Sequence, residues 1–168
     1  MTLPSTYADR NCSLARALAV VGERWTLMIL RDAFFGVRRF GDFATQLGIP
    51  RAVLTSRLKL LVAEGVMTRS DGQYLLTDKG IALWPVLRSL IGWGDEFYSP
   101  TGVKRALLHD KDGGVVDPAG RCETCRKIVK VPDIRVEPGP GYEPGAAELD
   151  PVSQALNTPH RLLEATTS

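Results

Sequence analysis

The sequence predicts a mainly helical α+β fold with a small β-hairpin wing, followed by a small β-rich appendage. Two observations support this prediction. Apolar side chains recur at helical spacing on both sides of a glycine-containing turn at residues 47–50, which indicates two helices joined by a tight turn. Directly after the second helix, an Asp-Gly pair separates two strand-like runs, an arrangement typical of a β-hairpin. Together they predict a winged helix-turn-helix.

Three helices are expected ahead of the turn. The first has one apolar stripe through Leu14, Leu18 and Val21, whereas the second, at residues 23–34, is apolar nearly all round. A helix without a polar face is usually buried, so the second helix should be the hub of the unit. The third helix, at residues 40–47, is short and leads into the turn.

The helix after the turn, at residues 50–64, is the predicted recognition helix. Gly48 suits the left-handed cap of the preceding helix, and Pro50 suits the first turn of the new one. Leucines at helical spacing form its buried stripe. The opposite face is small, hydroxylated and basic, and such side chains can approach base edges and pair with phosphates. That face consists of Arg51, Ala52, Thr55, Ser56, Arg57 and Lys59.

The wing is predicted at residues 66–77, beside the recognition helix. In that position Arg69 and Gln73 would reach the adjacent groove or the phosphate backbone. Arg38 and Arg39 precede the third helix, where they suit backbone contacts; a solvated loop is the alternative for either residue.

Positive charge is concentrated in this unit. From Arg31 to Arg69 there are seven Lys/Arg and three Asp/Glu side chains, whereas the whole chain has a formal net charge of only +2. Binding to the phosphate backbone requires such a local basic patch. We therefore predict a double-stranded DNA operator as a partner. A winged unit that docks another protein is the alternative, but it would not need a basic helix face.

A long helix is expected over residues 78–98, with Thr77 as its N-cap and a kink at Pro85. Its apolar side chains cover more than one face, which exceeds what the winged unit of one chain can cover. A second copy of the chain would explain the surplus, because large exposed apolar patches usually mark interfaces. The alternative is that residues 101–168 fold back over this surface. The predicted homodimer interface comprises Leu14, Leu18, Val21, Trp84, Leu87, Ile91, Phe97 and Tyr98.

Several runs resemble the HxlR family of bacterial winged-helix regulators, in consistent order over roughly residues 10–98. They are residues 12–32, which include GERWTLMILRD, and the runs RFGDF at 39–43, LTSRLKLL at 54–61 and YLLTDKG at 74–80. The resemblance implies a homodimeric transcription factor. In such a protein the first and last helices of the unit would form the dimer, and the two recognition helices would occupy successive major grooves.

Cys12 lies at the predicted N-terminus of the first helix, where the helix dipole favours a thiolate. In several regulators of the HxlR type a cysteine at this place is associated with the sensing of oxidants or quinones. The resemblance therefore implies a redox switch, and an oxidant or another small molecule as its signal. The alternative is an inert cysteine packed at the dimer seam.

The predicted organisation has three parts. Residues 1–100 form the DNA-binding and dimerisation domain, residues 101–136 a small β-rich appendage with a CxxC pair, and residues 137–168 a proline-rich, acidic and flexible tail. Within these parts we expect short strands at residues 106–109 and 127–131 and a short helix around residues 152–156.

The CxxC pair belongs to a potential set of metal ligands: His109, Asp112, Cys122 and Cys125. Zinc accepts all of these side chains. Some members of the family that the chain resembles carry a cysteine where this chain has Asp112, however, and a structural site that loses a thiolate often loses its metal. We therefore favour a metal-free loop and expect no cofactor. Zinc binding and a reversibly oxidised dithiol are the alternatives.

Catalysis and membrane insertion find no support in the sequence. The chain has two histidines and no metalloprotease, hydrolase or nucleotide-binding motif, so we expect no enzyme. No apolar run reaches the ~20 residues of a membrane span, no signal peptide is recognisable, and three cysteines do not form a secreted disulfide framework. A cytoplasmic protein is expected. A redox or metal-handling protein that uses Cys12 or the CxxC pair is the third class of function.

Overall fold

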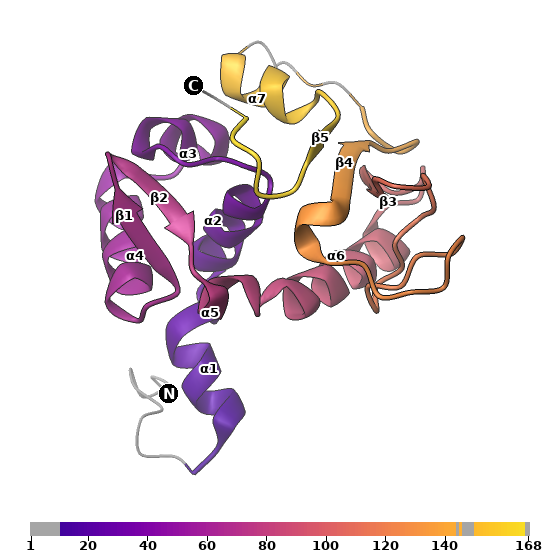
Figure 1. Cartoon of the computed structure of the whole chain (residues 1–168). Coiled ribbons are helices and arrows are strands. Elements are labelled where there is room, and N and C mark those ends of the chain that lie inside the picture. Colours follow the sequence, from indigo (N-terminus) through magenta and orange to yellow (C-terminus); the bar gives the residue numbers. More distant parts are fainter. Residues whose placement is uncertain (1–10, 144, 146–149, 167–168) are drawn as a thin grey trace.

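A computed structural model describes residues 11–143, 145 and 150–166, which Figure 1 shows as a ribbon. A helical unit with a two-stranded wing occupies one side of the molecule, and a unit with a three-stranded sheet occupies the other. Helix α6 (Trp84–Tyr98) extends from the first unit along the second, and α1 (Ser13–Val21) projects away from both (Figure 1). Within the described ranges, no helix is long and apolar enough to cross a membrane.

The predicted winged helix-turn-helix is confirmed. It consists of α2 (Arg24–Phe34), α3 (Phe40–Leu47), α4 (Arg51–Ala63), β1 (Met67–Ser70) and β2 (Gln73–Leu76). As expected, α2 is the hub, because six of its side chains are buried. Strands β1 and β2 are antiparallel, and Asp71 and Gly72 between them have positive φ angles of 50° and 75°. Such angles are those of the two-residue turn that an Asp-Gly pair favours.

The expected long helix at residues 78–98 is two helices, α5 (Asp78–Ile81) and α6. Thr77 caps α5 as predicted, since its hydroxyl oxygen accepts a hydrogen bond of 3.2 Å from the Gly80 amide. Pro85 does not kink a continuous helix. It lies in the first turn of α6, where its missing N–H has no intrahelical partner to lose.

The second unit is built on an antiparallel sheet in the order β3-β4-β5, formed by β3 (Arg105–His109), β4 (Ile134–Pro138) and β5 (His160–Arg161). β3 contains the strand expected at residues 106–109. The strand expected at 127–131 is not formed, and a one-turn 3-10 helix, η1 (Val131–Asp133), leads instead into the central strand β4. The apolar run at 127–131 therefore does not mark a strand. Ile128 is exposed, and only an isolated β-bridge joins it to Arg121.

The tail expected to be flexible from residue 137 onward is largely packed, which corrects the predicted boundary. Helix α7 (Pro151–Leu156) lies against α3, where the Ser153 hydroxyl donates a hydrogen bond of 2.9 Å to the Gln46 side chain. Leu162 is buried, and β5 completes the sheet that begins with β3. Prolines and acidic residues dominate this segment and its apolar residues are few, so composition alone did not reveal that Leu162 and helix α7 anchor it. The predicted domains also include residues 1–10, 144, 146–149 and 167–168, which lie outside the described residues.

Two of the eight residues assigned to the dimer interface belong to the core of the single chain. Trp84 and Leu87 are 4% and 5% exposed, and the Trp84 ring packs on Phe34 with 5.0 Å between ring centroids. These two side chains face inward because α6 packs on both units along one side. The others remain on the surface or at its edge: Leu14, Leu18, Phe97 and Tyr98 are exposed, and Val21 and Ile91 are half-buried.

Candidate nucleic-acid interface

Helix α4 is positioned by the turn at residues 47–50, which requires one residue in the left-handed backbone conformation. Gly48 ends α3 with φ of 58°, and its amide donates a hydrogen bond of 3.0 Å to the carbonyl of Ala44. Pro50 then occupies the N-cap of α4. The leucine stripe is buried as predicted, since Leu54 and Leu58 are at most 1% exposed. Burial of this stripe turns the opposite face of α4 outward.

The outward face carries most of the predicted DNA-contacting residues of this helix. Arg51, Ala52, Thr55, Ser56 and Lys59 are all exposed. Some of them are also ordered by local contacts. The Arg51 guanidinium lies over the Phe40 ring, 4.9 Å from its centroid, and the Thr55 hydroxyl donates a hydrogen bond of 2.8 Å to the Arg51 carbonyl. This face of α4 is therefore positively charged and exposed, and its uncharged side chains are small.

Arg57 lies on a different side of α4 from these residues. Its Nε lies 3.4 Å from a carboxylate oxygen of Glu23, and its side chain is 31% exposed. The same carboxylate accepts a hydrogen bond from the amide of Trp25, at the start of α2. Arg57 therefore links α4 to the beginning of α2, and it could reach DNA only by leaving Glu23.

The wing stands next to α4 and is fastened to the segment before α3. The Tyr74 amide donates a hydrogen bond of 2.7 Å to the Arg38 carbonyl. The backbones of Arg39 and Gln73 form an isolated antiparallel β-bridge. The Arg69 guanidinium lies over the Tyr74 ring at 5.5 Å from its centroid. A groove of about 430 Å³ runs between α4 and the wing, and Lys59 and Arg69 both line it.

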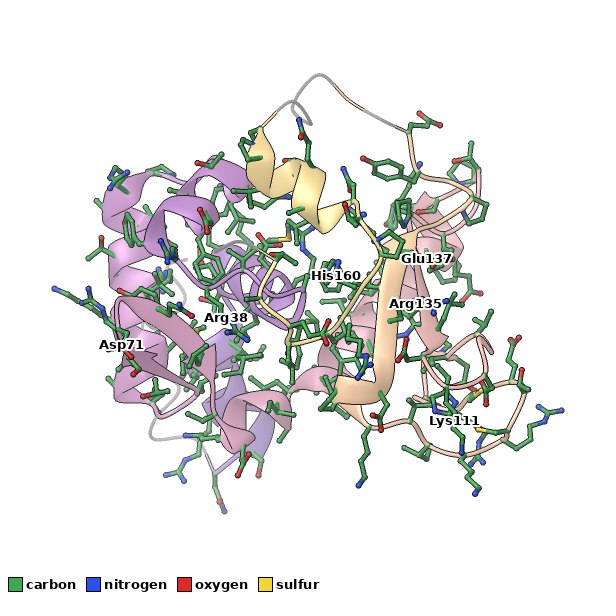
Figure 2. All side chains as sticks on the ribbon, turned by 45° about the horizontal axis from the view of Figure 1, so that its top comes forward. Arg38, Asp71, Lys111, Arg135, Glu137 and His160 are labelled. Carbon is green, nitrogen blue, oxygen red and sulfur yellow. The ribbon has the colours of Figure 1, made fainter. Side chains whose placement is uncertain are left out.

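Arg38 does not join this surface. It is half-buried, and its guanidinium donates a hydrogen bond of 2.7 Å to the carbonyl of Leu163. Figure 2 shows Arg38 set back from Asp71, which marks the tip of the wing. Sequence reasoning placed Arg38 and Arg39 together because they are neighbours, but only Arg39 is exposed.

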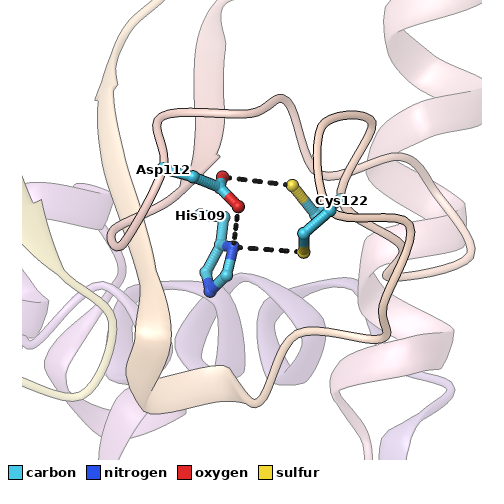
Figure 3. A group of neighbouring side chains, drawn as sticks. His109, Asp112 and Cys122 are labelled. Atoms are coloured by element: carbon cyan, nitrogen blue, oxygen red, sulfur yellow. Dashed lines mark hydrogen bonds and ion pairs between the residues drawn. The ribbon is translucent and has the colours of Figure 1, made fainter.

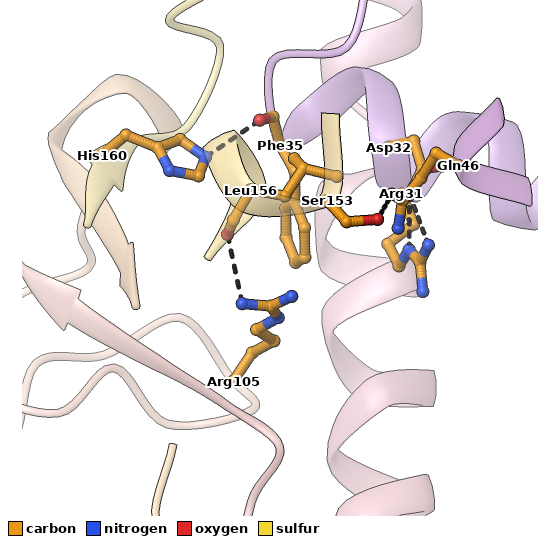
Figure 4. A network of polar contacts seen from close by, with 8 residues as sticks. All are labelled: Arg31, Asp32, Phe35, Gln46, Arg105, Ser153, Leu156 and His160. Carbon is orange, nitrogen blue, oxygen red and sulfur yellow. Dashed lines mark hydrogen bonds and ion pairs between the residues drawn. The ribbon is translucent and has the colours of Figure 1, made fainter. Parts of the chain in front are cut away.

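A second site lies between the two units, and sequence reasoning did not anticipate it. A cavity of about 490 Å³ is lined by residues of α2, α6, β3 and α7, among them Asp32. Arg31 Nε donates a hydrogen bond of 2.8 Å to one Asp32 oxygen, and the other oxygen has no hydrogen-bond partner among the described residues. Burial raises the pKa of Asp32, although the neighbouring Arg31 and Arg105 guanidinium groups act to lower it. Figure 4 shows the polar network around this carboxylate.

The structure also gives the positions of Cys12 and of the Cys122–Cys125 pair. Cys12 is exposed and occupies the N-cap of α1. His109, Asp112, Cys122 and Cys125 come together in the second unit, although the first two precede the last two by at least ten positions in the chain (Figure 3). The structure therefore unites the ligand set that the sequence only suggested.

A helix-turn-helix with an exposed basic second helix and an adjoining hairpin defines a winged helix-turn-helix DNA-binding protein. The profile of the HxlR-like helix-turn-helix family matches residues 20–101, which covers α2 to α6. The chain belongs to this family, and it is a DNA-binding transcriptional regulator of the HxlR type.

Individual relatives agree with this assignment. An uncharacterised HTH-type transcriptional regulator of Mycobacterium tuberculosis, Rv3095, is 45% identical over 139 residues, which span 78% of this chain and 88% of that relative. The Bacillus subtilis regulator YvaP is 33% identical over 94 residues, 51% of this chain and 87% of YvaP. The crystal structure of PA1607, a proposed transcription factor, is similar with a TM-score of 0.56 and 33% identity, over 86% of this chain and 96% of that one.

Proposed function

We propose that the chain acts as a homodimer that binds operator DNA through α4 and the β1-β2 wing. The observation that supports this most directly is the outward face of α4, where Arg51, Ser56 and Lys59 are exposed next to a groove that Arg69 lines from the wing. Small and basic side chains at this place suit a helix that enters the major groove. Arg39 and Gln73, whose backbones form an isolated β-bridge, would contact the phosphate backbone of DNA or its minor groove.

The dimer is supported by apolar surface that one chain leaves uncovered. At the C-terminal end of α6, Trp93, Phe97 and Tyr98 are 52%, 60% and 71% exposed and form one aromatic cluster. On α1, Leu14 is 65% exposed. Contiguous exposed aromatic side chains usually mark an interface, and a second copy would cover them. Two recognition helices would then face half-sites about one helical turn, ~34 Å, or a multiple of it apart.

Cys12 is the proposed entry point of an oxidant signal. It is exposed at the start of α1, the helix that projects from the body of the chain. With hydrogen peroxide, the Cys12 thiol would take up one oxygen atom as a sulfenic acid while the peroxide is reduced to water. A polar, bulkier group at this helix would change the packing of α1 against a second copy and release DNA.

A small-molecule signal would have a separate place to bind. The cavity beside Asp32 lies between the helix-turn-helix and the α6 segment, so a ligand there would contact both. Charged side chains such as Arg31, Asp32 and Arg105 line this cavity beside apolar ones, so a ligand with both polar and apolar groups would suit it.

The decisive experiment enriches genomic DNA fragments on the purified protein, with and without hydrogen peroxide. We expect a defined operator, two protected half-sites in a footprint, and an affinity that falls steeply as salt rises. A single protected half-site would contradict the homodimer, and no binding at low salt to any fragment would favour the protein-docking alternative. Equal loss of DNA by the wild type and Cys12→Ser at the same peroxide dose would remove Cys12 from the mechanism.

A further inference from the structure

We propose that His109, Asp112, Cys122 and Cys125 bind one zinc ion that fixes the loop at residues 110–130 to the end of β3. The four side chains offer one imidazole nitrogen, one carboxylate oxygen and two sulfur atoms, and these ligand atoms all lie within 4.8 Å of one another. Zinc is the metal whose structural sites combine cysteine and histidine in tetrahedral sets of four, and it also accepts a carboxylate. A metal-free loop was the expectation from sequence, and the geometry favours the alternative.

Three of the distances between these atoms are close to the edges of a zinc tetrahedron. His109 Nδ1 is 3.0 Å from Asp112 Oδ2, Asp112 Oδ1 is 3.2 Å from Cys122 Sγ, and Cys125 Sγ is 3.6 Å from His109 Nδ1 (Figure 3). Zinc bonds of ~2.0–2.3 Å imply edges of about 3.3–3.8 Å between ligands in such a tetrahedron. The widest separation among the four atoms, which all lie within 4.8 Å of one another, would have to shorten by up to about 1 Å to seat the ion.

The backbone around the four ligands is arranged to hold them. The Gly114 amide donates a hydrogen bond of 2.9 Å to Asp112 Oδ1, which orients the carboxylate toward the cysteines. Gly114 also allows a close approach, because a β-carbon there would lie only 2.5 Å from the Cys122 sulfur.

The loop has little else to hold its shape. Residues 110–130 are all described, and they form no helix or strand, only isolated bridges. The buried apolar side chains within them are few: Val116, Cys122 and Val129. Small segments with so little core generally need a cross-link or a metal. Zinc bound to four side chains would supply that cross-link.

The same loop braces α6, so the metal would act beyond its own loop. Arg88 of α6 is 8% exposed and donates a hydrogen bond of 2.9 Å to the Val116 carbonyl. One turn farther on, a β-carbon at Gly92 would lie 2.8 Å from Pro118, so helix and loop are in close contact. Bound zinc would thus stabilise the surface against which α6 packs, whether or not the chain binds DNA as proposed.

Metal content of the purified full-length chain tests the proposal directly. We expect about one zinc per chain by mass spectrometry of the metal, after incubation with zinc and gel filtration. Cobalt in place of zinc should give the absorption of thiolate-bound tetrahedral Co²⁺. Cys122→Ser should lose both signals, whereas Cys12→Ser is the matched control and should keep them, because Cys12 is the N-cap of α1 and not part of the loop at residues 110–130.

Asp112 variants keep the test decisive if Cys122→Ser fails to fold. Asp112→Asn should weaken zinc binding at least ~10-fold, and Asp112→Cys should strengthen it, because a thiolate is the better zinc ligand. Substoichiometric zinc in the wild type together with unchanged affinity in both variants would overturn the proposal. So would a titration in denaturant that finds one free thiol out of three cysteines, since that result would show a Cys122–Cys125 disulfide. None of these measurements depends on DNA.

Discussion

The guanidinium of Arg38 donates a hydrogen bond of 2.7 Å to the backbone carbonyl of Leu163, a residue 125 positions later in the chain. The Leu163 amide in turn donates a bond of 2.8 Å to the carbonyl of Phe34, at the end of α2. His160 adds a third contact, 2.9 Å from its Nε2 to the Phe35 carbonyl (Figure 4). The C-terminal segment is therefore fastened to the helix-turn-helix from which DNA binding is expected.

Arg38→Ala should lower the free energy of unfolding by about 1.5–3 kcal/mol, the usual contribution of a hydrogen bond from a charged, partly buried donor. Urea unfolding measures this change. Arg39→Ala is the matched control, because Arg39 is exposed and should alter stability by less than ~0.5 kcal/mol. Equal stability of the two variants would show that the contact with Leu163 contributes nothing.

Lys59→Ala should weaken operator binding and make it less sensitive to salt. If Lys59 neutralises one phosphate, the slope of log affinity against log salt should become shallower by about 0.9. Fluorescence anisotropy over a series of salt concentrations measures the slope. Lys111→Ala is the control, since Lys111 lies in the second unit, far from the wing (Figure 2). A wild-type slope in Lys59→Ala would remove this residue from the interface.

Phe97→Glu should convert the proposed dimer to monomers, because it places a charge in the exposed aromatic cluster at the end of α6. Light scattering after gel filtration would report the mass. Ile128→Glu introduces the same charge at a side chain of similar exposure, 62% against 60%, and should leave the dimer intact. Monomeric wild-type protein would refute the interface, and dissociation by both variants would show that it lies elsewhere or extends farther.

Asp32→Asn should change how stability depends on pH. Burial raises the pKa of Asp32 above its ordinary 3.8, with Arg31 and Arg105 opposing the shift, so the folded chain holds this proton to higher pH than the unfolded chain. The stability of the wild type should therefore fall as pH rises from about 4 through the folded-state pKa, relative to the variant. Unfolding in urea across this range tests the sign. Asp71→Asn, at the exposed tip of the wing, is the control, and parallel curves for wild type and Asp32→Asn would contradict the prediction.

Much of the helix-turn-helix could be predicted because its signals are local. Leucines at helical spacing, a glycine able to take a positive φ at Gly48, and the Asp-Gly turn act over a few residues, and the structure has each of them where expected. The second unit was harder, since the exposed Ile128 lies in a strand-like run, whereas the central strand β4 was not recognised. A strand that acquires its partners from residues 105–109 and 160–161 has no local pattern that identifies them.

The sequence by itself determined the helices of the winged unit, its hairpin and the basic face of α4, because periodicity and turn chemistry depend on neighbours along the chain. Tertiary structure decided which apolar side chains of α6 are core, so that Trp84 is buried and Phe97 is not. It also turned Arg38 toward Leu163 and brought Asp112 to Cys122. Those outcomes depend on contacts that form only in the folded chain, between side chains that no local pattern of the sequence joins.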